Sequence, residues 1–211
     1  MVLQNLTSHK RQLYLIKIER GKKMLGNTHA AVGAASGLIV LGELASHSPV
    51  VLVTGATLGA IGGLMPDIDL DSKHAKAVGF SSVLYLALQG AARNLTSSLA
   101  MSTTIAGLIA LIVLVVIGLK SNHRGFTHSI LALALFSTVT CLILGETWKW
   151  FAIGYASHLV IDLLNKKGES LLFPLTTKVC LNLCKADGIT NKVLGSLATV
   201  TTLVVLAGRI L

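Results

Sequence analysis

The sequence predicts an all-α fold, a polytopic transmembrane helical bundle of about six to seven helices. Of its 211 residues, 53% are hydrophobic and only 13% are charged, and the mean hydropathy is +0.73. A soluble domain of this size has more surface than so few charged side chains can cover. Apolar runs long enough to enter a bilayer alternate with short polar segments, which is typical of a chain that crosses a membrane repeatedly.

The apolar runs predict seven helices, and their residues indicate how each one packs. The first two are rich in Gly and Ala, and the pairs Gly33/Gly37 and Gly55/Gly59 permit close helix approach, although such pairs are common in membrane helices. The second and third are short for a span and need cover from neighbouring helices. The fourth is the clearest span because it ends in an unbroken aliphatic run. The expected ranges are 28–45, 49–65, 78–92, 97–119, 126–145, 147–164 and 193–211.

The connections differ in length and character. Those near 46–48, 93–96 and 146 are short, so the helices they join are expected to form antiparallel hairpins. The segment 165–192 is too polar for a span. Within it, alternating apolar and polar residues from Val179 predict a short strand. This segment is either a flap at the membrane surface near the functional residues or a plain connector.

Residues 1–23 form a basic arm that permits two interpretations. The arm can lie on anionic lipid. Alternatively, the native protein begins at Met24, because residues 19–23 can be encoded by a purine-rich stretch that resembles a ribosome-binding site. The domain expected from the sequence is then the membrane-embedded part, 24–211.

The distribution of positive charge predicts the orientation of the bundle. The net charge is +9, and fifteen of the eighteen Lys and Arg residues lie on one side of the predicted helices. Cytoplasmic loops of membrane proteins are enriched in such residues. The protein is therefore expected in the cell inner membrane with this side facing the cytoplasm. The basic residues are dispersed without interleaved aromatic residues, which argues against nucleic acid as a partner. Cys141, Cys180 and Cys184 form no CxxC pair, so neither a disulfide framework nor a thiolate metal site is expected.

The most informative polar residues are histidines and aspartates near the helix ends on this side. His158 and Asp162 are one helical turn apart and share a face, so they can grip one metal ion, or the Asp can orient the imidazole. Asp67 and Asp69 follow Pro66, which ends the preceding helix. In an extended turn the two carboxylates would point the same way and repel each other unless a cation lies between them. Solvated loop acids and an interfacial polar pair are the alternative interpretations.

The block His123-Arg124-Gly125-Phe126-Thr127-His128 carries the third motif. We expect His123 on a loop and His128 at the start of a helix capped by Thr127, so that both imidazoles can turn toward one ion. Arg124 is a candidate catalytic residue because its guanidinium matches phosphate, although an ordinary positive-inside anchor is the simpler interpretation of it alone. His29 opens the first helix, and its case as a ligand depends on the other motifs. His9, His47 and His74 have no second His or Asp motif beside them and are not expected to be ligands.

Together these motifs predict a site for divalent metal ions. One catalytic zinc needs about three protein ligands and an open position, so a larger set suits two ions. Nitrogen and oxygen ligands without Cys allow Zn, Mn or Fe without choosing among them. The expected metal ligands are His29, Asp67, Asp69, His123, His128, His158 and Asp162.

The same blocks resemble the YdjM-like family of inner-membrane metal-dependent hydrolases. The resemblance runs from Met24 to Pro174 and is carried by Thr28-His29, the run 63–69, the run 123–129 and the run 155–162. The His-Arg-Gly-x-Thr-His-Ser block is its most specific part. The resemblance implies the same seven polar residues as the core of the site.

The function expected from these observations is hydrolysis of an ester at the cytoplasmic face of the membrane. A phosphoester of a lipid-like substrate that enters from the bilayer suits two metal ions, with Arg124 assisting. Membrane lipid is therefore the expected partner. The alternatives are a transporter coupled to metal ions or protons, and a membrane protein with a structural metal site. Transport sites usually lie near the membrane midplane, whereas these motifs lie at helix ends.

Overall fold

A computed structural model of the chain describes residues 26–41, 48–94, 98–175, 177–183 and 189–210. Seven α-helices lie within these residues, so the predicted all-α class is confirmed. Their bounds are α2 Gly26–Leu41, α3 Pro49–Leu64, α4 Lys73–Asn94, α5 Ser98–Lys120, α6 Ile130–Leu144, α7 Trp148–Leu163 and α8 Ile189–Ile210. Three short 3-10 helices connect them: η2 Met65–Asp69, η3 Phe126–His128 and η4 Gly145–Thr147.

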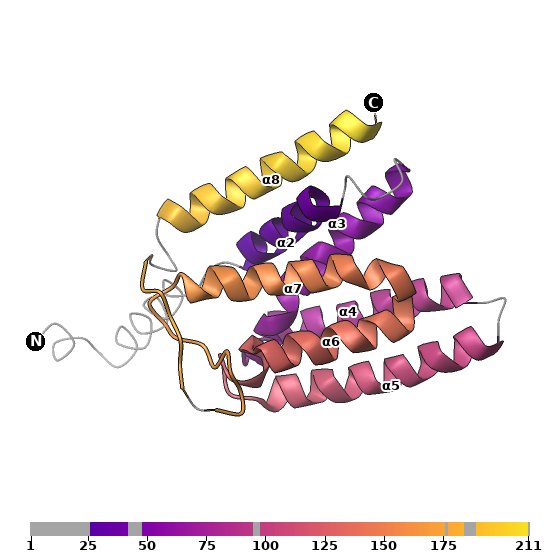
Figure 1. Ribbon diagram of the computed structural model, residues 1–211, viewed down its shortest axis with the longest axis horizontal. Coiled ribbons are helices and arrows are strands. Elements are labelled where there is room, and N and C mark those ends of the chain that lie inside the picture. The colour runs from indigo at the N-terminus through magenta and orange to yellow at the C-terminus, as the bar shows by residue number, and fades with distance from the viewer. Residues whose placement is uncertain (1–25, 42–47, 95–97, 176, 184–188, 211) are drawn as a thin grey trace, which may run out of the picture.

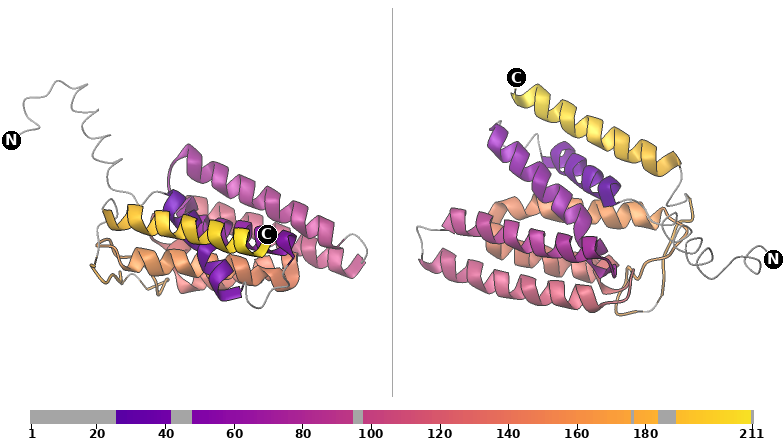
Figure 2. Two further views of the ribbon diagram at one scale, coloured as in Figure 1. Left: turned by 90° about the horizontal axis from the view of Figure 1, so that it is seen from above. Right: turned by 180° about the vertical axis from the view of Figure 1, so that it is seen from behind.

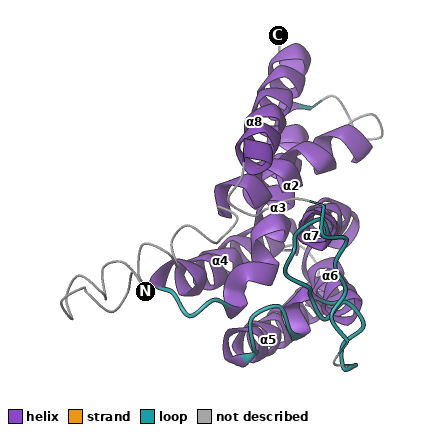
Figure 3. Cartoon of the chain, turned by 90° about the vertical axis from the view of Figure 1, so that its left-hand side faces the viewer, coloured by secondary structure: helices purple, strands orange, loops and turns teal. Residues whose placement is uncertain are grey.

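The helices form one bundle in which sequence neighbours run antiparallel. Figure 1 shows the hairpins α4–α5 and α6–α7 side by side, with α8 packed outside α2. Figure 2 shows the same order from above and from behind. Seen end-on, the loops that follow α5 and α7 gather at one end of the bundle (Figure 3). The predicted hairpins are thus present, although the turns 42–47 and 95–97 lie outside the described residues.

The outer surface of the bundle is apolar, as a membrane requires. Four helical segments are long and apolar enough to cross a bilayer: Pro49–Asp69, Ala100–Lys120, Ile130–Leu163 and Ile189–Arg209. The third segment contains α6 and α7 with the turn between them. On α5, six aliphatic side chains are 43–60% exposed, namely Ile105, Ile109, Ile112, Val113, Val116 and Ile117. Surface of this kind is stable only against lipid or another apolar partner.

Glycines allow α2, α3 and α7 to pack with their backbones almost in contact. A Cβ atom on Gly33 would lie 2.3 Å from the carbonyl oxygen of Gly59, and one on Gly154 would lie 2.0 Å from the same oxygen. The close approach that the glycine pairs allow therefore occurs between α2 and α3. It brings the N-terminal end of α2 next to the C-terminal end of α3, where the candidate site lies.

Gly154→Ala is expected to lower the melting temperature of the detergent-solubilised protein. The added methyl group would meet backbone, which cannot rotate away, and such overpacking costs about 1–3 kcal/mol. Gly208→Ala is the matched control because a Cβ atom there would have nothing within 4 Å. In a helix interior, Gly→Ala otherwise stabilises by about 1 kcal/mol. Equal or higher melting temperatures for both variants would contradict the close packing at Gly154.

Two local expectations from the sequence are wrong. Residues 177–183 form no strand and contribute a single antiparallel bridge, between Glu169 and Val179. Extended backbone with only one paired residue cannot build a ladder. Thr127 does not cap the fifth predicted helix, because its hydroxyl donates to Asp69. Ser129 is the N-cap of α6 instead, and its Oγ accepts a hydrogen bond of 3.1 Å from the backbone of Ala132.

The segment after α7 covers the end of the bundle as a flap. The backbone N–H of Ser170 donates to the carbonyl of Arg124 at 3.0 Å, and that of Ile130 donates to the carbonyl of Leu171 at 3.0 Å. The N–H of Leu181 donates to the carbonyl of Leu163 at 2.7 Å. Main-chain hydrogen bonds thus hold residues 165–183, where described, against the loop that carries His123 and against the end of α7. Of the two interpretations of this segment, the structure supports the flap.

Candidate metal centre

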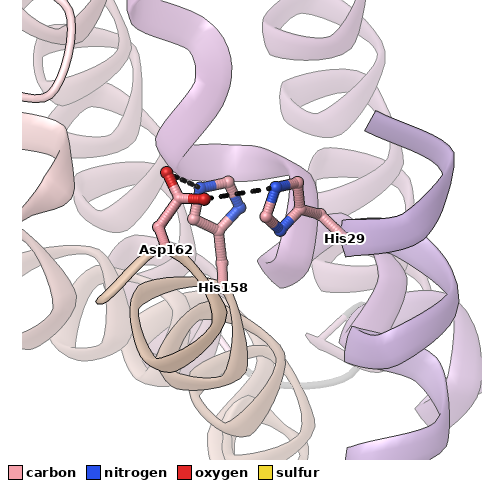
Figure 4. Close-up of side chains that lie close together, drawn as sticks. All are labelled: His29, His158 and Asp162. Atoms are coloured by element: carbon pink, nitrogen blue, oxygen red, sulfur yellow. Dashed lines mark ion pairs between the residues drawn. The ribbon is translucent and has the colours of Figure 1, made fainter. Parts of the chain in front are cut away.

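His29, His158 and Asp162 meet between α2 and α7, as Figure 4 shows. The imidazole rings of His29 and His158 are stacked, with centroids 3.8 Å apart and planes inclined by 23°. The Nε2 atom of His29 lies 3.6 Å from Oδ1 of Asp162. All three side chains are almost fully buried. The helix positions that were expected to place His158 and Asp162 on one face do so.

His158 is held in one orientation by the backbone. Its Nδ1 donates to the carbonyl oxygen of Gly63 at 2.7 Å, so Nε2 keeps its lone pair for another partner. That Nε2 faces the Nε2 of His128 at 3.3 Å and lies 4.0 Å from Oδ2 of Asp162. Gly62 packs closely against α7, where a Cβ atom would lie 2.1 Å from the carbonyl oxygen of Phe151, and this contact brings the adjacent Gly63 carbonyl within reach of the ring.

His128 is likewise held through its Nδ1 atom, by Asp69 in η2. Its Nδ1 lies 3.1 Å from Oδ2 of Asp69, and its Nε2 lies 3.8 Å from Oδ1 of Asp67 and 3.8 Å from Oδ2 of Asp162. Burial disfavours the imidazolium form, but the hydrogen bond to Asp69 and the nearby carboxylates outweigh burial and raise the pKa of His128. The site therefore concentrates negative potential at His128, where a cation would be stabilised.

Asp69, in η2, makes hydrogen bonds to residues of the block His123–His128. Its Oδ1 lies 2.9 Å from Nδ1 of His123. Its Oδ2 accepts hydrogen bonds from the backbone N–H of Arg124 at 2.9 Å and from the hydroxyl of Thr127 at 2.8 Å. With its lone pairs so occupied, Asp69 is better placed to orient the two imidazoles than to bind an ion directly.

The two aspartates do not point together as an extended turn would require. They lie in the 3-10 helix η2, and Pro66 at its start fixes the backbone there. As a result Asp69 is fully buried against the loop 122–128, while the Asp67 side chain is 19% exposed and faces His128. Asp71 lies apart from the site and pairs with Lys76 on the surface. His74 is exposed, and His9 and His47 lie outside the described residues.

Arg124 lies inside the site and is bonded to protein groups. Its backbone has a φ of 60°, in the left-handed region that most residues avoid. Its guanidinium lies 2.5 Å from Oδ2 of Asp162 and donates to the carbonyl of Lys167. Because these groups occupy both terminal nitrogens, the structure places Arg124 as the counter-charge of Asp162. Its Nε has no hydrogen-bond partner among the described residues.

The spacing of the donor atoms fits a divalent cation. With bonds of about 2.0–2.1 Å to nitrogen, two ligands of one tetrahedral ion lie about 3.3–3.4 Å apart. The two Nε2 atoms of His128 and His158 are 3.3 Å apart, and both have their other nitrogen fixed. Three sets of side chains can each hold an ion: His29/His158/Asp162, Asp67/His128/His158 and Asp69/His123/His128. All seven predicted ligands therefore belong to one connected cluster, and His123, 40% exposed, forms its outer edge.

Three further residues of the site were missed in the sequence analysis. Asn165 donates through Nδ2 to Oδ1 of Asp162 at 3.0 Å, and Tyr155 donates through its hydroxyl to the carbonyl of Thr127 at 2.5 Å. Asn165 lies just beyond the end of α7, where its backbone N–H donates to the carbonyl of Asp162 at 3.1 Å and the turn brings its side chain to the carboxylate. Glu169 lies in the flap and is 0% exposed. In the sequence, Glu169 stands alone in a connecting segment rich in Lys, and no motif or spacing links it to the other site residues.

Glu169 is an unusual carboxylate because neither oxygen has a hydrogen-bond partner among the described residues. Burial raises its pKa from the ordinary 4.5 to about 8, and Asp162 adds to the rise. The folded protein thus holds this proton more tightly than the unfolded chain does. The corresponding stability is fully present below about pH 4.5 and is lost as the pH rises toward 8.

Glu169→Gln is expected to abolish this loss in metal-free protein. Between about pH 5 and 8 the wild type should lose up to about 1.4 kcal/mol of stability per pH unit from this group, and the variant should not. Melting temperatures of chelator-treated protein across this range measure the difference. Glu146→Gln, at an exposed turn, is the control. Parallel curves for wild type and Glu169→Gln would show that Glu169 is ionised throughout.

Comparison with known proteins adds the family. The model of a family described as YdjM inner membrane protein matches residues 24–210. The chain belongs to this family. It is 28% identical over 142 residues to the uncharacterized protein YfhP of Bacillus subtilis, a match that covers 60% of this chain and 37% of that protein. It is 37% identical over 60 residues to the inner membrane protein YdjM of Escherichia coli, covering 25% and 31% respectively.

The matches therefore span about a third of the length of these curated relatives. No solved structure matches the chain. The resemblance drawn from the four motifs is confirmed, and the protein is an inner membrane protein of this family with four segments that can span the bilayer.

Proposed function

We propose that this protein is a metal-dependent hydrolase that cleaves an ester, specifically a phosphoester of a lipid-like substrate. The observation that carries the proposal is the facing pair of imidazoles. His128 and His158 present their Nε2 atoms to each other at 3.3 Å, with oxygens of Asp67 and Asp162 within 4.0 Å of them. Divalent ions bound to these residues would supply Lewis acidity for hydrolysis.

The residues of the chain prepare the site before any ion binds. Asp69 and the Gly63 carbonyl fix the two rings, so little side-chain freedom is lost on binding. The carboxylate of Asp162 presents Oδ1 to His29 and Oδ2 to His128, and with His29 and His158 it would hold one of the ions. Arg124 balances part of the resulting negative charge. In this arrangement Arg124 acts on substrate only if binding frees its guanidinium from Asp162.

The position of the cluster favours an enzyme over a transporter. The ligands come from the first turn of α2, from η2, from the loop 121–125 and η3 after it, and from the last two turns of α7, all at one end of the bundle. A site for transport is expected near the middle of the span, with broken helices around it. The two helices that carry ligands, α2 and α7, are each continuous, and the ligands lie at their ends rather than at a break in mid-helix.

The test is hydrolysis by protein purified without chelators or metal-affinity resin. We expect more than one transition-metal ion per chain by elemental analysis, and turnover of at least one member of a panel of phosphoesters and carboxylesters. Chelation should abolish turnover, and re-addition of Zn, Mn or Fe should restore it. Stoichiometric metal with no turnover of any ester would favour a structural metal site, and absence of metal would contradict the proposed centre.

We further propose that the end of the bundle that carries the site faces the cytoplasm, because it holds most of the Lys and Arg residues. In a variant without native cysteines, Asn122→Cys should resist an impermeant maleimide in intact cells and react after permeabilisation. Ser48→Cys, before α3 at the opposite end, should react in intact cells. Labelling of position 122 in intact cells would reverse the orientation.

A further inference from the structure

Two cavities adjoin the candidate metal centre and share part of their lining. The first, of about 260 Å³, lies under the flap and is lined by residues that include His123, Arg124, Ser170 and Lys178. The second, of about 610 Å³, lies between α5 and α6 and is lined mainly by Leu114, Ile117, Phe126 and Leu135, with Lys120 at its end. Asn122, Gly125 and Phe173 line both.

The two cavities differ in chemistry in a way that matches the membrane. The smaller one is lined by the cation of Lys178 and by His123 at the outer edge of the metal cluster. Arg124 also lines it, with its guanidinium paired with Asp162. The larger one is apolar and lies beside the outward face of α5, which would contact lipid. Among the described residues that line the two cavities there is no Asp or Glu. The two neighbouring cavities together therefore suit a molecule with an anionic head and an apolar tail.

The residues that line both cavities are held in place by their contacts. Phe126 and Phe173 meet edge-to-face with ring centroids 5.7 Å apart. The flap that carries Phe173 is held by the hydrogen bonds between Ser170 and Arg124 and between Leu171 and Ile130. A Cβ atom on Gly125 would lie 2.7 Å from the carbonyl oxygen of Asn122, so this tight turn leaves no room for a side chain at the boundary.

We propose that the two neighbouring cavities together bind an anionic membrane lipid, with its phosphate in the cavity beside Arg124 and Lys178 and one acyl chain in the groove between α5 and α6. Lys178, which lines the smaller cavity, pairs with the phosphate, and Lys120 at the end of the apolar groove adds positive charge at the level of the headgroups. This proposal rests on the proposed function in one respect, that the bound lipid is also the substrate. The phosphate then lies next to His123 and the metal ligands behind it.

A second apolar cavity provides an internal comparison. It has about 670 Å³, lies between α6 and α7, and is lined by residues that include Ser137, Cys141, Leu142 and Trp148. No Lys or Arg lines it. If lipid bound to apolar grooves in general, it would also bind in this groove between α6 and α7. Binding there would not favour anionic lipids, because the groove has no cationic side chain.

The experiment is photo-crosslinking with phosphatidic acid that carries a diazirine in one acyl chain, followed by mapping of the labelled residues. We expect labels on α5 and α6 at Leu114, Ile117 and Leu135, and competition by phosphatidic acid but not by phosphatidylcholine or glycerol phosphate. Leu135→Trp should reduce labelling at least ~10-fold by filling the groove, and Ile117→Trp should repeat the effect from α5. Leu142→Trp, on the same helix but in the other groove, should leave labelling unchanged. Lys178→Ala should weaken competition at least ~3-fold.

The outcomes separate this proposal from the proposed function. Labels spread around the bundle, or centred on Leu142, would overturn the lipid site even if soluble esters are hydrolysed. Equal competition by glycerol phosphate would also overturn it, because the acyl chain would then contribute nothing. The expected labelling pattern in a protein that hydrolyses no ester would leave the lipid site standing and remove the hydrolase.

Discussion

His158→Ala and Asp162→Asn should each abolish stoichiometric metal binding and the activity that depends on it. His158 presents Nε2 to His128 at 3.3 Å, and Asp162 presents its two oxygens to His29 and His128. Loss of an orienting group typically costs about 10–100-fold in metal affinity or activity, and loss of a direct ligand costs more. Metal content by elemental analysis and affinity by competition with a chelating dye measure the effect.

The two variants should differ in stability, which helps to separate their roles. Asp162→Asn leaves the guanidinium of Arg124 buried without its counter-charge, a change that typically costs about 3–5 kcal/mol. His158→Ala removes one hydrogen bond to the Gly63 carbonyl and leaves a cavity, so it should cost less. His74→Ala, at an exposed position of α4, is the control for both. Wild-type metal content in both variants would show that this motif only supports the bundle.

The sequence was sufficient to predict the helices and the composition of the site. Hydropathy locates each helix within a few residues because lipid-facing and buried positions are both apolar in a membrane bundle. The exception is α4, which begins five residues earlier than expected, at Lys73. Its first turn is polar, so hydropathy gave no signal for it. The seven ionisable residues were predictable because such groups are rare in membrane spans and tend to have functional roles there.

The division of labour among these residues could not be predicted. That Asp69 orients two imidazoles while Asp67 faces the ion position depends on the 3-10 geometry of η2, which spacing alone does not specify. From its residue type, Arg124 was expected to bind phosphate. In the structure its guanidinium contacts Asp162 and the carbonyl of Lys167. Glu169 reaches the site through the path of the flap, and no periodicity in the sequence encodes that path.

The pair Asp67 and Asp69 offers the sharpest test of the assigned roles, because the two carboxylates are two residues apart and should respond oppositely. Asp69→Asn disrupts a buried carboxylate that contacts His123, His128, Thr127 and the backbone of Arg124. Its amide nitrogen cannot accept the hydrogen bonds that Asp69 accepts, so we expect a loss of about 3–5 kcal/mol of stability. Metal affinity should fall by about 10–100-fold, as for an orienting group.

Asp67→Asn should leave stability nearly unchanged and remove metal binding more completely. The Asp67 side chain is partly exposed, and its Oδ1 lies 3.8 Å from Nε2 of His128, beyond hydrogen-bond distance. Its attraction to His128 acts without a hydrogen bond, so its loss should destabilise the metal-free fold far less than Asp69→Asn does. Thermal melts of chelator-treated protein and dye-competition titrations on both variants give the two readouts. If Asp69→Asn were the variant that lost metal outright while keeping its stability, Asp69 would be a direct ligand and the orienting role would pass to Asp67.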